Sequence, residues 1–592
     1  MNKGILSFLL FSFSLLAGQQ KPVQIAFLSD VHFQDLYGSF SDHDFKGIVN
    51  PKTGKSTILR TMDSQLRSTR IFNENYFAFL KALDDIAAKG IKIVAMPGDF
   101  SDDGQAYNLR GLHKVLDQYH RKHGMKFYLT PGNHDPVGPF RNDGGKDDFL
   151  GKEGRPLGIY SKEHIGKSID KIITKDIAES GYLEILNELK GFGFYPQKED
   201  LFWSTPFDHV SLKDYSYTKA LQSAEYSRRM YEVAKGFSVP DLSYVTEPVK
   251  GVWMIAIDGN TYLPKNINES PQNTSNYKGA AIGYNNVLTN KKHLIQWVKK
   301  LADEAKRNNK TLIAFTHYPM IDFNDGAGRD IKNVLGEKKW QLERVPQEDV
   351  AKVFTEAGLQ IHFAGHMHIN DTGIRRFGDH FLVNVQVPSL AAYLPGYKIL
   401  TLTSPDKMEV QTEVLYNVPH FDDLFPLYEK EYLALEKEGR NILWNREILK
   451  AKSYHEFMLF HLQELVRLRM IPHDWPEDFI KKGRQLNGKD LLLLVLDSNS
   501  SMDTDEFREW MFDDLLFDLY KFQSADELAK KDIPAKRWQQ YQTLIRLFEQ
   551  NESKDPFIIQ LKSVFRILSL LSSGDPSDHF EIDFKKQEIK RL

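Results

Sequence analysis

The sequence of 592 residues contains no cysteine. Disulfide bonds, thiolate metal ligands and a cysteine nucleophile are therefore excluded, and any metal ligands have to be His, Asp, Glu or Asn. The formal net charge is −3, so no overall basic field is present to hold nucleic acid. Beyond the N-terminal residues, no apolar run approaches the roughly 20 residues that a membrane-spanning helix needs.

The N-terminus does carry a short apolar run. Lys3 precedes the apolar residues Ile5 to Leu16, and the small residues Ala17 and Gly18 follow. This pattern is typical of a secretory signal peptide, which we assign to residues 1–18 with cleavage near Gly18. We therefore expect a secreted or periplasmic protein without a transmembrane segment in its mature chain.

Strand-like and helix-like segments alternate from residue 22 to about residue 403. Such alternation predicts an α/β core with a largely parallel sheet. The expected strands are 23–28, 91–96, 125–129, 252–257, 311–315 and 360–364, and the expected helices are 72–89, 109–122 and 291–308.

The length and the texture of the chain predict several domains. The core pattern occupies residues 19–420, and it is interrupted at 136–250 by an insertion that we expect either to cap the sheet edge or to elaborate the surface. Residues 421–592 are rich in Leu, Phe, Glu and Lys at helical spacing and predict a C-terminal helical domain. The aromatic residues Trp510, Phe512, Phe517 and Tyr520 are expected to pack its core, with a partner-binding surface as the alternative.

Five short polar elements follow the apolar strands of the core. They are Asp30-Val31-His32, Gly98-Asp99-Phe100-Ser101-Asp102, Gly132-Asn133-His134-Asp135, the single His317, and Gly365-His366-Met367-His368. Residues just past strand ends gather along one edge of an open α/β sheet, where such folds place their sites. Asp, Asn and neutral His are ligands for divalent ions such as Zn, Mn and Fe. The glycines permit tight turns before the ligands.

In this order, the five elements resemble the calcineurin-like metallophosphoesterase superfamily, over roughly residues 22–415. The resemblance implies a four-layer sandwich, in which two mixed sheets are flanked by helices, with a dinuclear site at one edge. It implies that Asp30, His32 and His368 hold one metal, that Asn133, His317 and His366 hold the other, and that Asp99 bridges them. His362, inside the preceding strand, is expected to point away from the site.

The resemblance also implies the chemistry. His134 would lie over the substrate phosphate as general acid, and Asp102 would orient it, because pairing with a carboxylate favours the protonated imidazole. A hydroxide held between two divalent ions, Mn, Zn or Fe, would attack phosphorus in line. The expected activity is hydrolysis of a phosphate monoester or diester of unidentified structure.

Two departures narrow the resemblance. The purple acid phosphatase branch has a Tyr metal ligand where this chain has Asp102, and family 5′-nucleotidases carry a β-rich C-terminal domain, unlike the helical segment here. A nuclease of the same fold is the alternative enzyme, which the lack of net basic charge disfavours. A metal-stabilised scaffold without turnover is the remaining alternative; the presence of His134 and of every expected ligand disfavours it.

Overall fold

The computed structural model describes residues 22–208, 211–440, 443–497 and 501–592. The predicted signal peptide, residues 1–18, lies outside the described residues and stays a prediction. Within those ranges no helix combines the length and the apolar character that crossing a bilayer requires.

The first of two large sheets contains the N-terminal strands of the core. Its seven strands, in spatial order, are β21 (Glu588–Arg591), β20 (His579–Asp583), β19 (Lys407–Val414), β18 (Gly396–Ser404), β1 (Gln24–Phe27), β4 (Ile93–Pro97) and β5 (Lys126–Thr130). β1, β4 and β5 are parallel, whereas β18 pairs with β1 in the antiparallel direction. The sheet is therefore mixed rather than largely parallel.

The second sheet also has seven strands. In spatial order they are β16 (Asp371–Phe377), β17 (His380–Gln386), β15 (Ile361–Ala364), β14 (Thr311–Thr316), β13 (Val252–Ile257), β12 (Tyr244–Val249) and β9 (Trp203–Ser204). β13, β14, β15 and β17 are parallel to one another. The buried runs that the sequence presents at 252–257, 311–315 and 360–364 are its central strands.

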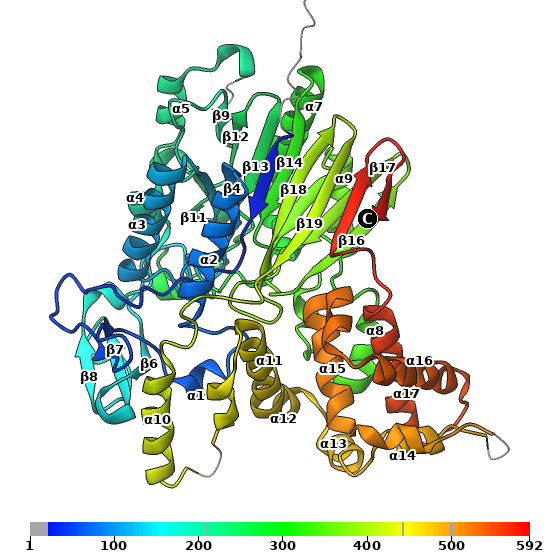
Figure 1. Cartoon of the computed structure of the whole chain (residues 1–592). Coiled ribbons are helices and arrows are strands. Elements are labelled where there is room, and N and C mark those ends of the chain that lie inside the picture. Colours follow the sequence, from blue (N-terminus) through cyan, green and yellow to red (C-terminus); the bar gives the residue numbers. More distant parts are fainter. Residues whose placement is uncertain (1–21, 209–210, 441–442, 498–500) are drawn as a thin grey trace, which may run out of the picture.

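The two sheets pack face to face, with helices on the outer faces (Figure 1). Phe27 of β1 stacks on Phe363 of β15 with ring centroids 3.7 Å apart. Helices α2 (Asn75–Ala88) and α3 (Ala106–His123) bury their apolar faces in the cluster that contains β1 and β4. Helices α7 (Lys292–Arg307) and α9 (Glu348–Glu356) cover the second sheet, α7 against β14 and α9 against β16 and β17. This arrangement is the expected four-layer sandwich.

Residues 136–250 are partly integrated into the core. β9 and β12 belong to the second sheet. The rest forms a small sheet of β6 (Gly145–Leu150), β7 (Pro156–Tyr160) and β8 (Lys171–Ile173), a hairpin of β10 (Met230–Ala234) and β11 (Phe237–Pro240), and the helices α4 (Tyr182–Leu189) and α5 (Tyr217–Ser223).

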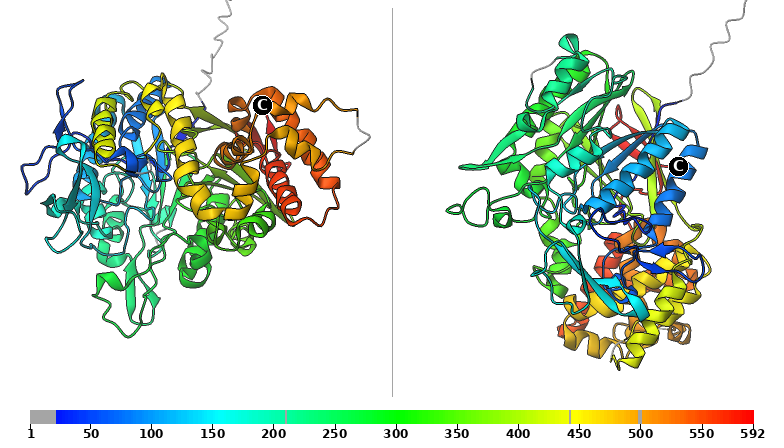
Figure 2. Two further views of the ribbon diagram at one scale, coloured as in Figure 1. Left: turned by 90° about the horizontal axis from the view of Figure 1, so that it is seen from below. Right: turned by 90° about the vertical axis from the view of Figure 1, so that its left-hand side faces the viewer.

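A bundle of helices follows the sandwich and gathers at one end of the two sheets (Figures 1 and 2). Trp510, Phe512 and Tyr520 are buried in its core, as expected, whereas Phe517 is only partly buried against that core. The helices are α10 (Phe425–Lys437), α11 (Tyr454–Leu465), α12 (Ile471–Asp474), α13 (Glu477–Gly483), α14 (Gly488–Leu493), α15 (Phe512–Ala525), α16 (Ala535–Gln550) and α17 (Pro556–Leu571).

The predicted helical segment 421–592 differs from the structure at its end. After α17 the chain returns to the first sheet, where β20 pairs with β19 and β21 pairs with β20. In the sequence, the helices thus form an insertion between β19 and β20, which are neighbouring strands of one sheet. The domain boundary at residue 421 stays a prediction.

Candidate metal centre

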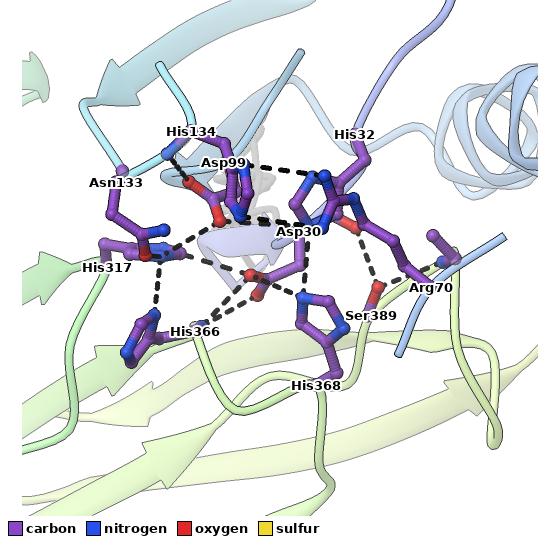
Figure 3. A network of polar contacts seen from close by, with 12 residues as sticks. Asp30, His32, Arg70, Asp99, Asn133, His134, His317, His366, His368 and Ser389 are labelled. Atoms are coloured by element: carbon purple, nitrogen blue, oxygen red, sulfur yellow. Dashed lines mark hydrogen bonds and ion pairs between the residues drawn. The ribbon is translucent and has the colours of Figure 1, made fainter. Parts of the chain in front are cut away.

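The side chains that the sequence singles out all follow parallel strands and meet at one edge of the sandwich (Figure 3). Asp30 and His32 follow β1, Asp99 follows β4, Asn133 and His134 follow β5, His317 follows β14, and His366 and His368 follow β15. Backbone bonds tie neighbouring loops together: the N–H of His32 donates to the carbonyl of Asp99 at 2.8 Å.

A first group of donor atoms comes from Asp30, His32, Asp99 and His368. One ligand atom from each of these buried residues lies within 4.8 Å of those of the other three. The Nε2 atoms of His32 and His368 are 3.0 Å apart. His368 Nε2 is 3.4 Å from Asp30 Oδ1, and His32 Nε2 is 3.8 Å from Asp99 Oδ2.

A second group is centred on His317. Its Nε2 lies 3.1 Å from Asn133 Oδ1, 3.1 Å from His366 Nδ1 and 3.2 Å from Asp99 Oδ2. Asp99 Oδ2 therefore faces both groups, and the structure brings all seven predicted ligands together.

Backbone carbonyls orient three of the four imidazoles. His317 Nδ1 lies 3.1 Å from the carbonyl of Pro97, His366 Nε2 lies 3.0 Å from that of Ala281, and His368 Nδ1 lies 3.2 Å from that of Thr69. A carbonyl only accepts hydrogen bonds, so these outer nitrogens carry the proton. In the neutral rings the inner nitrogens then present lone pairs to the cluster, the orientation that metal-binding histidines adopt.

Charge supports the same reading. Burial lowers the pKa of His32 and of His366 well below the ordinary range, which favours neutral rings. Burial also disfavours charge on His317, yet the Asp99 carboxylate raises its pKa to about 9. The cluster thus attracts positive charge, and its nitrogen and carboxylate donors fit divalent metal ions.

The backbone of the cluster is strained. Positive φ angles occur at Asp30 (50°), His32 (44°), Asp99 (47°), His366 (73°) and His368 (58°). A non-glycine residue in this region costs on the order of 1–3 kcal/mol, and such residues concentrate at functional sites. The sequence does not predict this strain, because the identity of a residue does not determine its φ angle.

Three glycines make room for the cluster. Gly98 has a φ angle of +76°, and an added Cβ would overlap the ring of His317. At Gly132 a Cβ would overlap the Asp99 carboxylate, and at Gly365 it would overlap the side chains of Ser29 and Asp30. The sequence predicts turns at these glycines; at Gly132 and Gly365 the requirement is close approach of the backbone to a ligand.

The predicted partner of His134 requires a correction. His134 Nδ1 lies 2.5 Å from Asp103 Oδ1, and Lys146 of β6 pairs with the other oxygen of Asp103. Asp102 instead accepts hydrogen bonds from Arg60 and Arg70, each at 3.0 Å. The reason lies in the backbone. The N–H of Asp102 still bonds the carbonyl of Phe33, whereas Asp103 has a left-handed φ of 54°, and its side chain meets His134.

Arg70 is a neighbour of His134 that sequence reasoning missed. Its Nη1 lies 3.5 Å from His134 Nε2, while its Nη2 is held by Asp102. Arg70 sits in a polar loop without a motif, and no sequence signal distinguishes it from the other basic residues there. His362 points away from the cluster, as predicted. Its Nδ1 lies 2.8 Å from Asn384 Oδ1.

An open cavity of about 250 Å³ leads to the cluster. Asp99, Asn133, His134, His366 and His368 form its floor. The described residues that line it include none from 136–250; its walls come from the 341–344 segment, from α11 and α15, and from the turn after α11. The helical bundle, rather than the predicted insertion, therefore covers the site.

Comparison with known proteins identifies the core. Residues 23–233 match the model of the calcineurin-like phosphoesterase family. This part of the chain is similar to that family. The phosphoesterase match begins at β1 and contains Asp30, His32, Asp99, Asn133 and His134. Among curated proteins, no sequence matches the chain significantly.

Solved structures with a similar arrangement include two phosphatases. A dimetal phosphatase from Danio rerio has a TM-score of 0.34 at 8% identity, covering 66% of this chain and 96% of its own. The purple acid phosphatase PPD1 from yellow lupin seeds has a TM-score of 0.30 at 10% identity, covering 67% and 52%. GAP50, the anchor in the inner membrane complex of Plasmodium, has a TM-score of 0.26 at 9% identity, covering 67% and 85%.

Proposed function

We propose that the protein is an exported phosphoesterase that uses two divalent metal ions to hydrolyse phosphate monoesters or diesters. The observation that carries this proposal is the pair of donor groups that share Asp99 Oδ2, with inner imidazole nitrogens turned toward both. Asp30, His32 and His368 would hold one ion, and Asn133, His317 and His366 the other. Export rests on the N-terminal sequence, residues 1–18.

Bound ions would supply charge neutralisation on the phosphoryl oxygens and an activated water. The remaining work falls to side chains of the cavity floor. His134 is held from one side by Asp103 and faces the cavity, so it is placed to give a proton to the departing oxygen. Arg70, 3.5 Å from His134, is placed to bind a phosphoryl oxygen. The surrounding bundle reduces access of bulk water.

The test combines metal analysis with turnover. The full mature chain is stripped of metal, reloaded with Mn, Zn or Fe, and assayed on an aryl phosphate and a bis-aryl phosphate. We expect two ions per chain and hydrolysis of at least one ester. Asp99→Asn should lose metal and at least about 100-fold in turnover, because removing a group that only supports a ligand already costs roughly 10–100-fold.

Asp303→Asn is the matched control, since Asp303 lies on the surface of α7 and is more than half exposed. It should retain both metal and turnover. A metal-loaded wild-type chain that hydrolyses neither ester would refute the proposal, and an Asp99→Asn chain that still binds two ions would refute the role of Asp99.

A further inference from the structure

Two arginines on the cavity wall have no acidic partner. Arg344 is the last residue of the short helical turn Leu342–Arg344, and Arg469 lies in the π-helical turn between α11 and α12, Val466–Met470. Arg70, the third arginine of the cavity, pairs with Asp102. Among the described residues, no carboxylate lies within ion-pair distance of Arg344 or Arg469; their hydrogen bonds go to Gln341 Oε1 at 2.6 Å and to the carbonyl of Arg67 at 3.1 Å.

The state of Arg344 is costly without a ligand. Burial lowers its pKa, which reflects the loss of hydration of the charge. A guanidinium nevertheless stays protonated in proteins. Glu343 and Asp99 attract this partly buried cation from beyond ion-pair distance, and an anion in direct contact with it in the cavity would offset the remaining cost. Arginine is also the side chain best suited to bind a carboxylate or a phosphate through two parallel N–H bonds.

The position of the two arginines separates them from the floor of the site. Both also line an adjoining cavity of about 470 Å³, which continues outward past the basic residues Lys338 and His473 and the acidic residues Glu343 and Asp474. They stand where the two cavities meet, next to Gln341, Tyr520 and Gln523, which line both. Among the described residues lining the inner cavity, the only carboxylate is that of Asp99. A group leaving the phosphorus at the floor would therefore extend past unpaired positive charge.

We propose that the substrate is a phosphate ester whose leaving group carries a second anionic group, a phosphate or a carboxylate, and that Arg344 and Arg469 bind this group. The inference rests on the proposed function and specifies its substrate class. The bundle then has a role in recognition as well as in covering the site, because Arg469 belongs to it.

The test compares esters that differ only at the far end. The metal-loaded full chain is assayed on butanediol monophosphate, butanediol bisphosphate and 4-phosphonooxybutanoate. We expect kcat/KM to be at least about 10-fold higher for the bisphosphate, after correction for its equivalent ester bonds, or for the carboxylate, because hydrogen bonds to charged groups contribute about 1.5–3 kcal/mol and 1.4 kcal/mol is tenfold. The better of these two substrates identifies the second anion.

Variants assign the preference to the arginines. In Arg344→Gln and Arg469→Gln, kcat/KM for the preferred substrate should fall about 10-fold more than for the monophosphate. Arg467→Gln is the matched control: Arg467 lies in the same π-helical turn, but it pairs with Glu464 and does not line the cavity. It should preserve the wild-type preference.

Two results would overturn the inference while leaving the proposed function intact. One is a wild-type chain that hydrolyses an aryl phosphate but shows no preference for a second anion. The other is an equal loss on all substrates in the arginine variants, which would assign the arginines to the scissile phosphate. Failure to hydrolyse any ester, aryl phosphate included, would instead refute the proposed function. The wild-type comparison needs no variant and stays decisive if a variant misfolds.

Discussion

Asp102 and Asp103 are adjacent in the chain but hold different groups. Asp102 is fully buried between two guanidinium groups, and Asp103 is shared by His134 and Lys146. Burial alone would raise the pKa of Asp103, but Lys146 and His134 hold it well below the ordinary range, so this carboxyl is ionised beside the imidazole. One of the two acids therefore positions the proposed general acid, and the other anchors the loop that carries Arg60 and Arg70.

This division predicts opposite phenotypes. Asp103→Asn should lower kcat roughly 10- to 100-fold with little change in KM or in metal content, as loss of part of a general acid that contributes about 100- to 10 000-fold. Asp102→Asn should instead lower the free energy of unfolding by about 1–3 kcal/mol, because the two arginines lose the carboxylate that they share, while Arg60 keeps Asp148. Turnover kinetics and denaturant unfolding of both variants distinguish the two roles.

His134→Ala sets the scale for this comparison, with a larger loss of kcat than Asp103→Asn and metal still bound. If Asp102→Asn reduced kcat at unchanged stability while Asp103→Asn did not, Asp102 would be the residue that orients His134, as the sequence predicts.

At the residue scale, most of the cluster can be predicted from the sequence. The seven ligand candidates are recognisable because each directly follows an apolar strand, and strand ends meet at a sheet edge. The partner of His134 is not recognisable, since a single left-handed residue decides which of two neighbouring acids faces it. The sequence also gives no signal for Arg70, Arg344 and Arg469, because long-range packing alone brings them to the cavity.

Among the elements, α10 and α11 do more than cover the core. They hold the segment that contains α1 (Met62–Gln65) and ends near Arg70. Glu431 of α10 accepts hydrogen bonds from the backbone N–H groups of Met62 and Asp63 at 2.7 and 2.9 Å. Tyr428 donates to Glu74 at 2.6 Å. The bundle thus fixes the loop that places Arg70 beside His134.

Glu431 makes this contact sensitive to pH. Burial raises its pKa to about 8 from 4.5, so the folded protein binds a proton that the unfolded chain releases above pH 4.5. The stabilisation is fully present below about pH 4.5 and is lost as pH rises to about 8. We expect the thermal midpoint to fall across this window, and Glu431→Gln to flatten that part of the profile.

Glu436→Gln is the control on the same helix, where Glu436 is exposed. It should keep the wild-type slope. An identical slope in Glu431→Gln would show that other groups produce the dependence.

The type of each core element was predictable, whereas partnership across the chain was not. Apolar runs such as 252–257 and helical periodicity such as 291–308 lie close to β13 and α7. The sheet direction was predicted less well, because β18 and β19 add to β1 from a distant part of the sequence. The strands β20 and β21 are missed for the same reason: β20 pairs with β19 across about 170 residues of intervening chain, and β21 pairs only with β20.

For the molecule as a whole, the proposed metal ions would act as part of the core. The cluster joins loops from both sheets, so ions bound there stabilise the folded state by mass action, about 2.7 kcal/mol at a free concentration 100 times Kd. Chelation should lower the thermal midpoint by roughly several degrees, and adding Mn, Zn or Fe should restore it. Asp99→Asn should respond weakly to chelation. A chain shown to have lost its metal, with an unchanged midpoint, would contradict this role.

The return of β20 to the edge of β19 also limits how the bundle can move. Because its entry and exit lie on adjacent strands, the bundle is tethered at two nearby points and cannot swing away like a free tail. Any opening becomes a tilt about the line through those points, a hinge with one axis. We therefore expect substrate to enter sideways along the outer cavity, and the width of that passage, rather than release of the bundle, to set how large an ester can be admitted.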